Sequence, residues 1–296
     1  MISTAQAARF RRAQALAYEC VEAVGAQLEE GQTERQVCAT MQRWLTERGV
    51  TEWFHQPFAW FGERTTFAAS PVWTPLHFFP SGRRLRPGMP VILDVAPIVD
   101  GATADVGWST WFGPEPNALH EQMLQDLAPY RDLVLQGVRA ERTLQQVYRD
   151  VDALLDEQGY RSVHRRYPFA VIAHLVADHD PRPGDDPVPL APRRVPGPLR
   201  GRRVGGFGLD AQRFLAHELR ETVQGRVASP LWNGSGFSDH RAQPGLWAVE
   251  PHVGFRDIGV KWEELLVVDE SDAAWLDDDL PHVRRWQARD SERAVA

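Results

Sequence analysis

Residues 89–107 read Met-Pro-Val-Ile-Leu-Asp-Val-Ala-Pro-Ile-Val-Asp-Gly-Ala-Thr-Ala-Asp-Val-Gly, and this stretch predicts more about the fold than any other. The apolar run 91–95 is typical of a buried strand that carries Asp94. A turn follows, and residues 103–106 read as the strand that returns beside the first, with Asp105 on it. We therefore expect a β-hairpin with a carboxylate on each strand.

The turn of this hairpin decides how the two aspartates face each other. With Val99-Asp100 as the two-residue turn they are directly opposite, and with Asp100-Gly101 Asp94 opposes Gly107 and Asp105 is its diagonal neighbour. Both registers place the carboxylates on one face, with their Cβ atoms about 5 to 8 Å apart. Like charges this close repel unless a cation or a proton lies between them. The hairpin alone leaves two interpretations open, a bridging metal pair and a solvated hairpin with accidental acids.

A helical pattern occurs twice along the chain. Apolar residues spaced by three and four predict helices over 4–29 and 33–49, and again over 124–138 and 143–159, with a kink or break at Pro129. The segments 33–49 and 143–159 both begin with Thr-x-x-Gln-Val, a capping-box pattern, and both end on glycine at the same distance. Such a match predicts two structurally equivalent halves.

The strands repeat as well. Pro87-Gly88 precedes an apolar run that ends in Asp94, and Pro244-Gly245 precedes one that ends in Glu250. Glu263 lies within a second apolar run, 260–268. A buried carboxylate without a partner is costly, so packing alone does not explain these acids. Four carboxylates on paired strands, with a histidine, suit hard-to-borderline divalent ions. Two such ions can activate a water molecule and polarise a carbonyl.

With these residues in place, the sequence resembles the pita-bread metallopeptidases, the superfamily of methionine aminopeptidase, Xaa-Pro aminopeptidase, prolidase and creatinase. The family's ligands come in the order Asp, Asp, His, Glu, Glu, and its two aspartates are separated by ten residues, as Asp94 and Asp105 are. Its third acid ends a Pro-Gly strand and precedes proline, as Glu250-Pro251 does. Its last acid follows a Gly-Val-basic-apolar run, which selects Glu263 over Glu264 in Gly259-Val-Lys-Trp-Glu-Glu. The resemblance covers roughly residues 8–270.

The resemblance implies an α+β pita-bread fold, a pseudo-twofold antiparallel sheet covered by helices. It implies a single catalytic domain over 1–270, with halves of about 1–115 and 116–270, followed by a C-terminal tail, 271–296. A proline-rich segment, 181–198, is expected to form a long ordered loop or a lid, since prolines disfavour helix and central strand. Residues 230–236 read as a further loop.

The resemblance also assigns the site. It implies two divalent metal ions (Mn, Co, Fe or Zn) held by Asp94, Asp105, His174, Glu250 and Glu263. Glu250 is also expected to act as general base, and His77, in His-Phe-Phe-Pro, to contact the substrate.

The histidine ligand departs from the family pattern. The usual Gly-His-Gly-Ile-Gly is replaced by Ile-Ala-His174-Leu-Val, and His179 follows five residues later. His164 and His179 are alternative ligands, and His179 is also a candidate second substrate-contacting histidine. His240 and His252 flank the strand that ends in Glu250, where either could line the cleft or lie at the surface.

The resemblance implies a metal-dependent hydrolase, an aminopeptidase that cleaves an N-terminal residue or an Xaa-Pro bond of a small peptide. Three alternatives stay open: a creatinase-like hydrolase of a non-peptide small molecule, a catalytically silent binding protein of the same fold, and a structural module whose acids merely cap strands. A measurement of bound metal would distinguish the structural module from the enzymes.

Composition narrows the partners. A chain of 296 residues with a formal net charge of −7 and no basic stripe argues against nucleic acid. No run approaches the roughly 18 apolar residues of a membrane helix. Two cysteines, Cys20 and Cys38, are expected to be buried reduced thiols, and no signal peptide is recognisable, so a cytoplasmic location fits best. A homodimer is possible.

Overall fold

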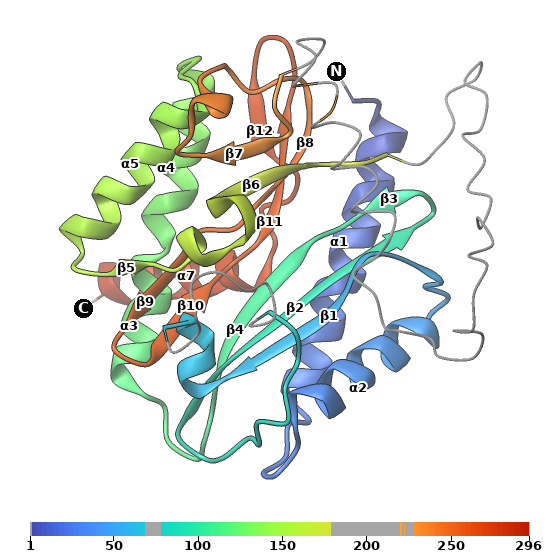
Figure 1. The fold of residues 1–296 in the computed structure, drawn as a ribbon, viewed down its shortest axis with the longest axis vertical. Helices are drawn as coiled ribbons and strands as arrows, with labels where there is room; N and C mark the ends of the chain where they lie inside the picture. The colour runs from blue at the N-terminus through green and yellow to red at the C-terminus, as the bar shows by residue number, and fades with distance from the viewer. Residues whose placement is uncertain (1, 69–77, 179–219, 221, 223–227, 296) are drawn as a thin grey trace.

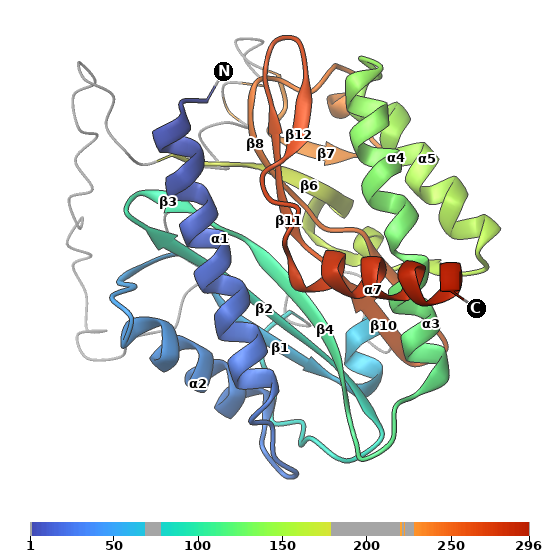
Figure 2. The ribbon, with the colours of Figure 1, turned by 180° about the vertical axis from the view of Figure 1, so that it is seen from behind.

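The computed structural model describes residues 2–68, 78–178, 220, 222 and 228–295. The proline-rich segment 181–198 lies outside these residues. Within the described part, the strands form three antiparallel sheets, and Figure 2 shows helices α1, α4 and α7 in front of the strands on one face. None of the described helices has the length and apolar character needed to span a bilayer.

The N-terminal half consists of two helices and a four-stranded sheet. Helices α1 (Thr4–Gly25) and α2 (Glu34–Thr46) precede β1 (Glu52–Phe61), β2 (Met89–Val99), β3 (Ala102–Thr103) and β4 (Val106–Phe112). The chain between β1 and β2 begins with a short 3-10 helix, η1 (Gly62–Thr66). The central strand, β2, pairs with β1 on one side and with β3 and β4 on the other (Figure 1).

The C-terminal half repeats this arrangement. Helices α3 (Ala118–Asp126), α4 (Ala128–Arg139) and α5 (Leu144–Glu157) precede a five-stranded sheet in the order β12-β11-β8-β6-β7. Its strands are β6 (Val171–Val176), β7 (Leu231–Asn233), β8 (Gly245–Val249), β11 (Glu264–Val268) and β12 (Ala273–Trp275). A smaller sheet of β5 (Arg161–Ser162), β9 (His252–Phe255) and β10 (Ile258–Lys261) lies in the order β10-β9-β5.

Both predicted capping boxes are present. The Thr33 hydroxyl accepts from the Gln36 N–H and the Gln36 side chain accepts from the Thr33 N–H, and Thr143 and Gln146 make the same pair. Because Leu127 separates α3 from α4, with Pro129 in the first turn of α4, the predicted break is also confirmed. The cap residues make equivalent isolated bridges, Thr33 to Arg84 and Thr143 to Arg241.

Two predictions need correction or extension. Residues 230–236 are not wholly a loop, because Leu231–Asn233 pair with β6 as the edge strand β7. Residues 271–296 were expected only as a tail, and they contain β12 and α7 (Pro281–Val295). Trp286 of α7 is 7% exposed and donates its indole N–H to the Leu124 carbonyl. This helix is therefore packed onto the body of the molecule.

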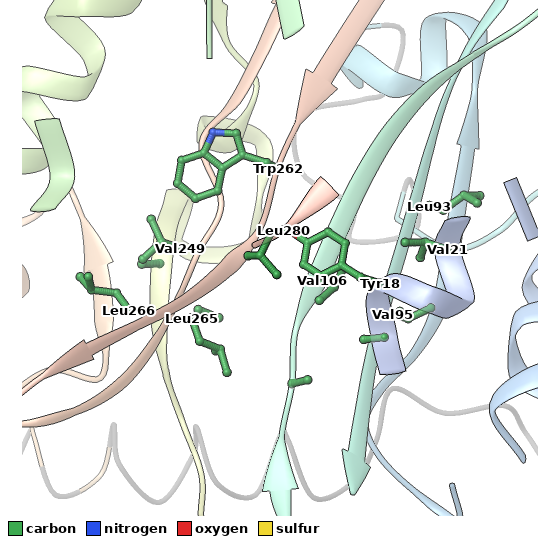
Figure 3. Close-up of a cluster of buried hydrophobic side chains, with 14 of the residues drawn as sticks. Tyr18, Val21, Leu93, Val95, Val106, Val249, Trp262, Leu265, Leu266 and Leu280 are labelled. Carbon is green, nitrogen blue, oxygen red and sulfur yellow. The ribbon is translucent and has the colours of Figure 1, made fainter. Parts of the chain in front are cut away.

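The main core lies between α1 and the strands. Figure 3 labels Tyr18 and Val21 of α1 beside Val95 and Val106 of the hairpin. Val249 and Leu265 of the five-stranded sheet belong to the same cluster. Cys20 and Cys38 are buried and unpaired with each other, as predicted. Burying the apolar faces of α1 and of both sheets in one core fixes the strand ends that carry the acids.

Candidate metal centre and active site

A cavity of about 440 Å³ opens where the strands of the two halves meet. One part of its lining is polar, and we call it the charged cluster: His55, Asp94, Asp105, His174, Glu250 and Glu263. The rest is dominated by rings, and we call it the aromatic lining: Phe54, Phe58, Trp60, Phe78, Phe79, Tyr167 and Phe169. Ionisable groups that converge in an apolar cavity are typical of a ligand or catalytic site.

The hairpin adopts the second of the two predicted registers. Asp94 pairs with Gly107, and Val99 pairs with Ala102, so Asp100-Gly101 is the turn. Both turn residues have positive φ, 49° and 76°, as a two-residue hairpin turn requires. Asp94 and Asp105 are both almost fully buried, and they share the cavity.

His174 lies on β6 and faces Asp105. Its Nε2 is 3.2 Å from Asp105 Oδ2, and its Nδ1 is 3.2 Å from the Leu175 carbonyl oxygen. Burial lowers the pKa of His174, but the hydrogen bond and the charge of Asp105 outweigh it, so the pKa is raised overall. The structure thus brings His174 to the acids.

Glu250 follows β8 and Glu263 lies between β10 and β11. Burial raises the pKa of both carboxyls, and nearby acids add to the effect. The opposing influence is Lys261, whose Nζ is 2.6 Å from Glu250 Oε2, 2.9 Å from Glu263 Oε2 and 2.8 Å from Asp94 Oδ2. A buried ammonium group therefore neutralises part of the cluster.

His55 is a member of the cluster that the sequence analysis missed. Its Nε2 lies 3.1 Å from Asp105 Oδ1 and 3.3 Å from Asp94 Oδ1. Burial lowers the pKa of His55, but the charge of Asp105 outweighs it and raises the pKa to about 9. The register of β1 against β2 shifts on both sides of His55, and such bulges redirect side chains. No period-two pattern could have predicted this orientation.

The aromatic lining is built from mutual ring contacts. Phe58 stacks on Trp60 with a centroid separation of 5.6 Å, and Phe78 packs against both rings. Phe54 stacks on His174 at 5.0 Å and 16°, which joins the lining to the charged cluster. Rigid rings held by other rings keep the cavity open and largely apolar.

The donor atoms fit divalent ions. One ligand atom each from Asp105, His174 and Glu263 lies within 4.8 Å of the others, and the same is true of Asp94, Glu250 and Glu263. Ligand atoms around one ion at about 2.1 Å are roughly 3.0–3.4 Å apart, close to the 3.2 Å between Asp105 Oδ2 and His174 Nε2. Asp94 Oδ1 is buried and accepts no hydrogen bond from any described residue. The oxygen-rich set with one or two imidazoles suits Mn, Co, Fe or Zn.

The other histidines considered as candidates lie either outside the described residues or outside the charged cluster. His77 and His179 lie outside the described residues. His164 is 2.9 Å from Ser162 Oγ, and His240 Nε2 accepts from the Ser229 N–H. His252 is fully buried and its Nδ1 is 2.8 Å from the Tyr167 hydroxyl. None of these three belongs to the metal-capable groups found among the described residues.

A family model described as metallopeptidase family M24 matches residues 8–270. The chain belongs to this family. An uncharacterized peptidase of Staphylococcus aureus (strain bovine RF122 / ET3-1) is 27% identical over 152 residues, which are 51% of this chain and 41% of that protein. A second, from strain MSSA476, is 26% identical over the same length. The matched region therefore covers about two-fifths of the length of each of these curated relatives.

Solved structures share the fold of this M24 chain. The X-Pro aminopeptidase of Thermotoga maritima MSB8 matches with a TM-score of 0.63 and 13% identity, over 95% of this chain and 63% of that one. The prolidase of Pyrococcus furiosus matches with a TM-score of 0.62 and 14% identity, over 93% and 64%. At this identity the likeness establishes the fold, and the predicted α+β pita-bread architecture is confirmed.

Proposed function

We propose that this M24 chain is a metal-dependent hydrolase that cleaves the amide bond after the N-terminal residue of a small peptide, including Xaa-Pro bonds. Two divalent ions form its full complement, held by Asp94, Asp105, His174, Glu250 and Glu263. The observation that carries the proposal is the convergence of these five side chains, from separate strands or strand ends, on one cavity.

The chemistry needs a cation and a base side by side. Divalent ions bound there would supply a Lewis acid and a water molecule of lowered pKa. Glu250 accepts the proton of the attacking water, and burial makes its carboxylate a stronger base than an exposed one. Without metal, the two oxygens of Asp105 contact the imidazoles of His55 and His174, which positions both rings close to the other ligands. On the family resemblance, His77 and His179 are proposed to contact the substrate carbonyl.

The aromatic lining favours an apolar side chain next to the scissile bond. Phe58, Trp60 and Phe78 present ring surface beside the charged cluster, which suits a proline ring or a larger apolar residue. Such a pocket would take short peptides whose first or second residue is apolar.

One observation favours the second candidate, a creatinase-like hydrolase of a non-peptide amide. Among the described residues that line the cavity there is no lysine or arginine to pair with the free carboxylate of a dipeptide. An apolar amide that lacks this carboxylate would fit the same lining.

A metal assay followed by a substrate screen tests the proposal. The purified protein is loaded with Mn²⁺, its bound metal is counted, and a library of short peptides and apolar amides is offered to wild type and to Glu250→Gln. Turnover of peptides by wild type and loss of turnover in the variant is the expected result. Bound metal with turnover of non-peptide amides alone would favour the second candidate, and failure to bind any divalent ion would overturn both.

A further inference from the structure

Lys261 lies where a divalent ion would otherwise sit. Its Nζ lies 2.6–2.9 Å from one carboxylate oxygen each of Asp94, Glu250 and Glu263, and its side chain is 0% exposed. An ammonium has three donors, so these contacts use all of them. The same three carboxylates form one of the metal-capable groups. The Lys261 ammonium therefore occupies one of the two positions at which a metal ion is expected.

The surrounding strands are shaped to admit this lysine. Gly107 pairs with Asp94 across the hairpin, and a Cβ at Gly107 would come within 2.1 Å of Lys261 Cε. Any side chain at position 107 would collide with the lysine stem. Ser109, two residues further along β4, accepts from the Lys261 N–H and donates its hydroxyl to the Lys261 carbonyl. Backbone and side chain of Lys261 are both held in place.

The metal-capable group of Asp105, His174 and Glu263 lacks this competitor, and a third group, of His55, Asp94 and Asp105, shares only Asp94 with the lysine contacts. Among the described residues, the Lys261 ammonium contacts Asp94, Glu250 and Glu263 but neither Asp105 nor His174, and Glu263 is the residue common to the group with His174 and the group at Lys261. A first ion can bind at Asp105, His174 and Glu263 while Lys261 keeps its contacts with Asp94 and Glu250. A second ion at Asp94, Glu250 and Glu263 must displace the ammonium, because two cations within about 3 Å repel strongly in a buried site.

We propose that Lys261 is an internal cation that competes with the second metal ion, so that the protein binds one divalent ion tightly and the second much more weakly. This rests on the proposed metal-dependent function, of which it specifies the order of loading. In the metal-free protein the same ammonium holds together three of the four carboxylates of the charged cluster.

Manganese titration of the chelator-treated protein tests the proposal, with bound ion counted by equilibrium dialysis and the free ion by electron paramagnetic resonance. Wild type is expected to bind one equivalent tightly and the second at least roughly 100-fold more weakly. Lys261→Met removes the charge and keeps the apolar stem, so the two affinities should move to within about tenfold. Lys261→Arg retains a cation and should keep the wide gap.

Gly107→Ala gives an independent route to the same result if Lys261→Met does not fold. Its methyl group would push the lysine stem off the hairpin and narrow the gap between the two affinities. The melting temperature without metal adds a second readout, since Lys261→Met should lose stability in chelator and recover more than wild type on saturation with Mn²⁺. Two equally tight equivalents in wild type would overturn the role of Lys261 while leaving the metal-dependent function intact. No bound ion in any variant would overturn both.

Discussion

The charged cluster takes its carboxylates from four different strands or strand ends, whereas three rings of the aromatic lining come from the single strand β1. The cluster depends on sheet register, because a slip of one residue would turn each acid away from the cavity. The lining depends on local packing in a small hydrophobic group around Phe58 and Trp60, separate from the main core. The proposed chemistry and the proposed selectivity thus depend on different parts of the fold, and substitutions should separate them.

The largest expected effect is a loss of hydrolysis, without a comparable loss of stability, when an acid of the charged cluster is replaced. Glu250→Gln keeps the side-chain shape and an acceptor for Lys261 but removes the base, so hydrolysis should fall roughly 10²–10⁴-fold. The melting temperature should change little by comparison. Glu121→Gln on α3, whose side chain is 42% exposed, is the matched control and should leave turnover unchanged. Equal turnover in both variants would contradict the assignment of Glu250.

The aromatic lining should respond in the opposite manner, through stability and selectivity. Phe58 is 5% exposed, so Phe58→Ala should lower the free energy of unfolding by about 3–5 kcal/mol. Turnover of substrates with large apolar residues should fall more than turnover of small ones. Phe237→Ala, at a residue that is 66% exposed, should cost less than about 0.5 kcal/mol in urea denaturation. Unchanged selectivity in Phe58→Ala would remove the lining from substrate recognition.

The charged cluster should make stability depend on pH in the metal-free protein. The pKa of His55 is raised to about 9 in the fold, above its ordinary value of 6.5. Its pairing with Asp105 therefore stabilises the fold fully below about pH 6.5 and is lost as the pH rises through 9, by on the order of 3 kcal/mol. Urea unfolding in chelator across this pH range should show that the free energy of unfolding falls more steeply for wild type than for His55→Gln. Parallel curves would show that His55 does not contribute.

The smallest expected effect is on metal affinity, at the contact between the charged cluster and the aromatic lining. Phe54 stacks on His174, so Phe54→Leu should loosen the imidazole and weaken binding of the first metal ion roughly twofold to tenfold. Trp60→Phe, in the lining but with its ring packed on Phe58, Phe67 and Phe78, is the control and should leave metal affinity unchanged. An equal loss in both would mean that the lining supports the cluster as a whole.

The sequence predicted the parts of this molecule that follow a period. The repeated Thr-x-x-Gln-Val became two capping boxes, and each cap residue bridges to an arginine that lies three residues before Pro87 or Pro244. Alternation along the hairpin placed Asp94 and Asp105 on one face. Such local and periodic features are encoded in neighbouring residues, so they can be predicted without coordinates.

The features that the sequence did not predict depend on irregular structure or on contacts between distant residues. His55 reaches the cluster because β1 is bulged, and both Phe54 and His55 line the cavity although they are adjacent in sequence. Lys261 was visible as the basic residue before Glu263, but its reach across Gly107 depends on the choice between two hairpin registers. Nothing in a single sequence specifies the bulge. The register could have been chosen, because a two-residue turn with positive φ at both positions favours Asp-Gly over Val-Asp.

The central claim is that the charged cluster is a metal centre, and anomalous diffraction tests it most directly. Crystals grown with Mn²⁺ or Zn²⁺ should show an anomalous peak among Asp105 Oδ2, His174 Nε2 and the Glu263 carboxylate, with a weaker peak near Lys261 Nζ at high metal concentration. A map with no peak in this cavity, or with ions bound elsewhere on the molecule, would contradict the account.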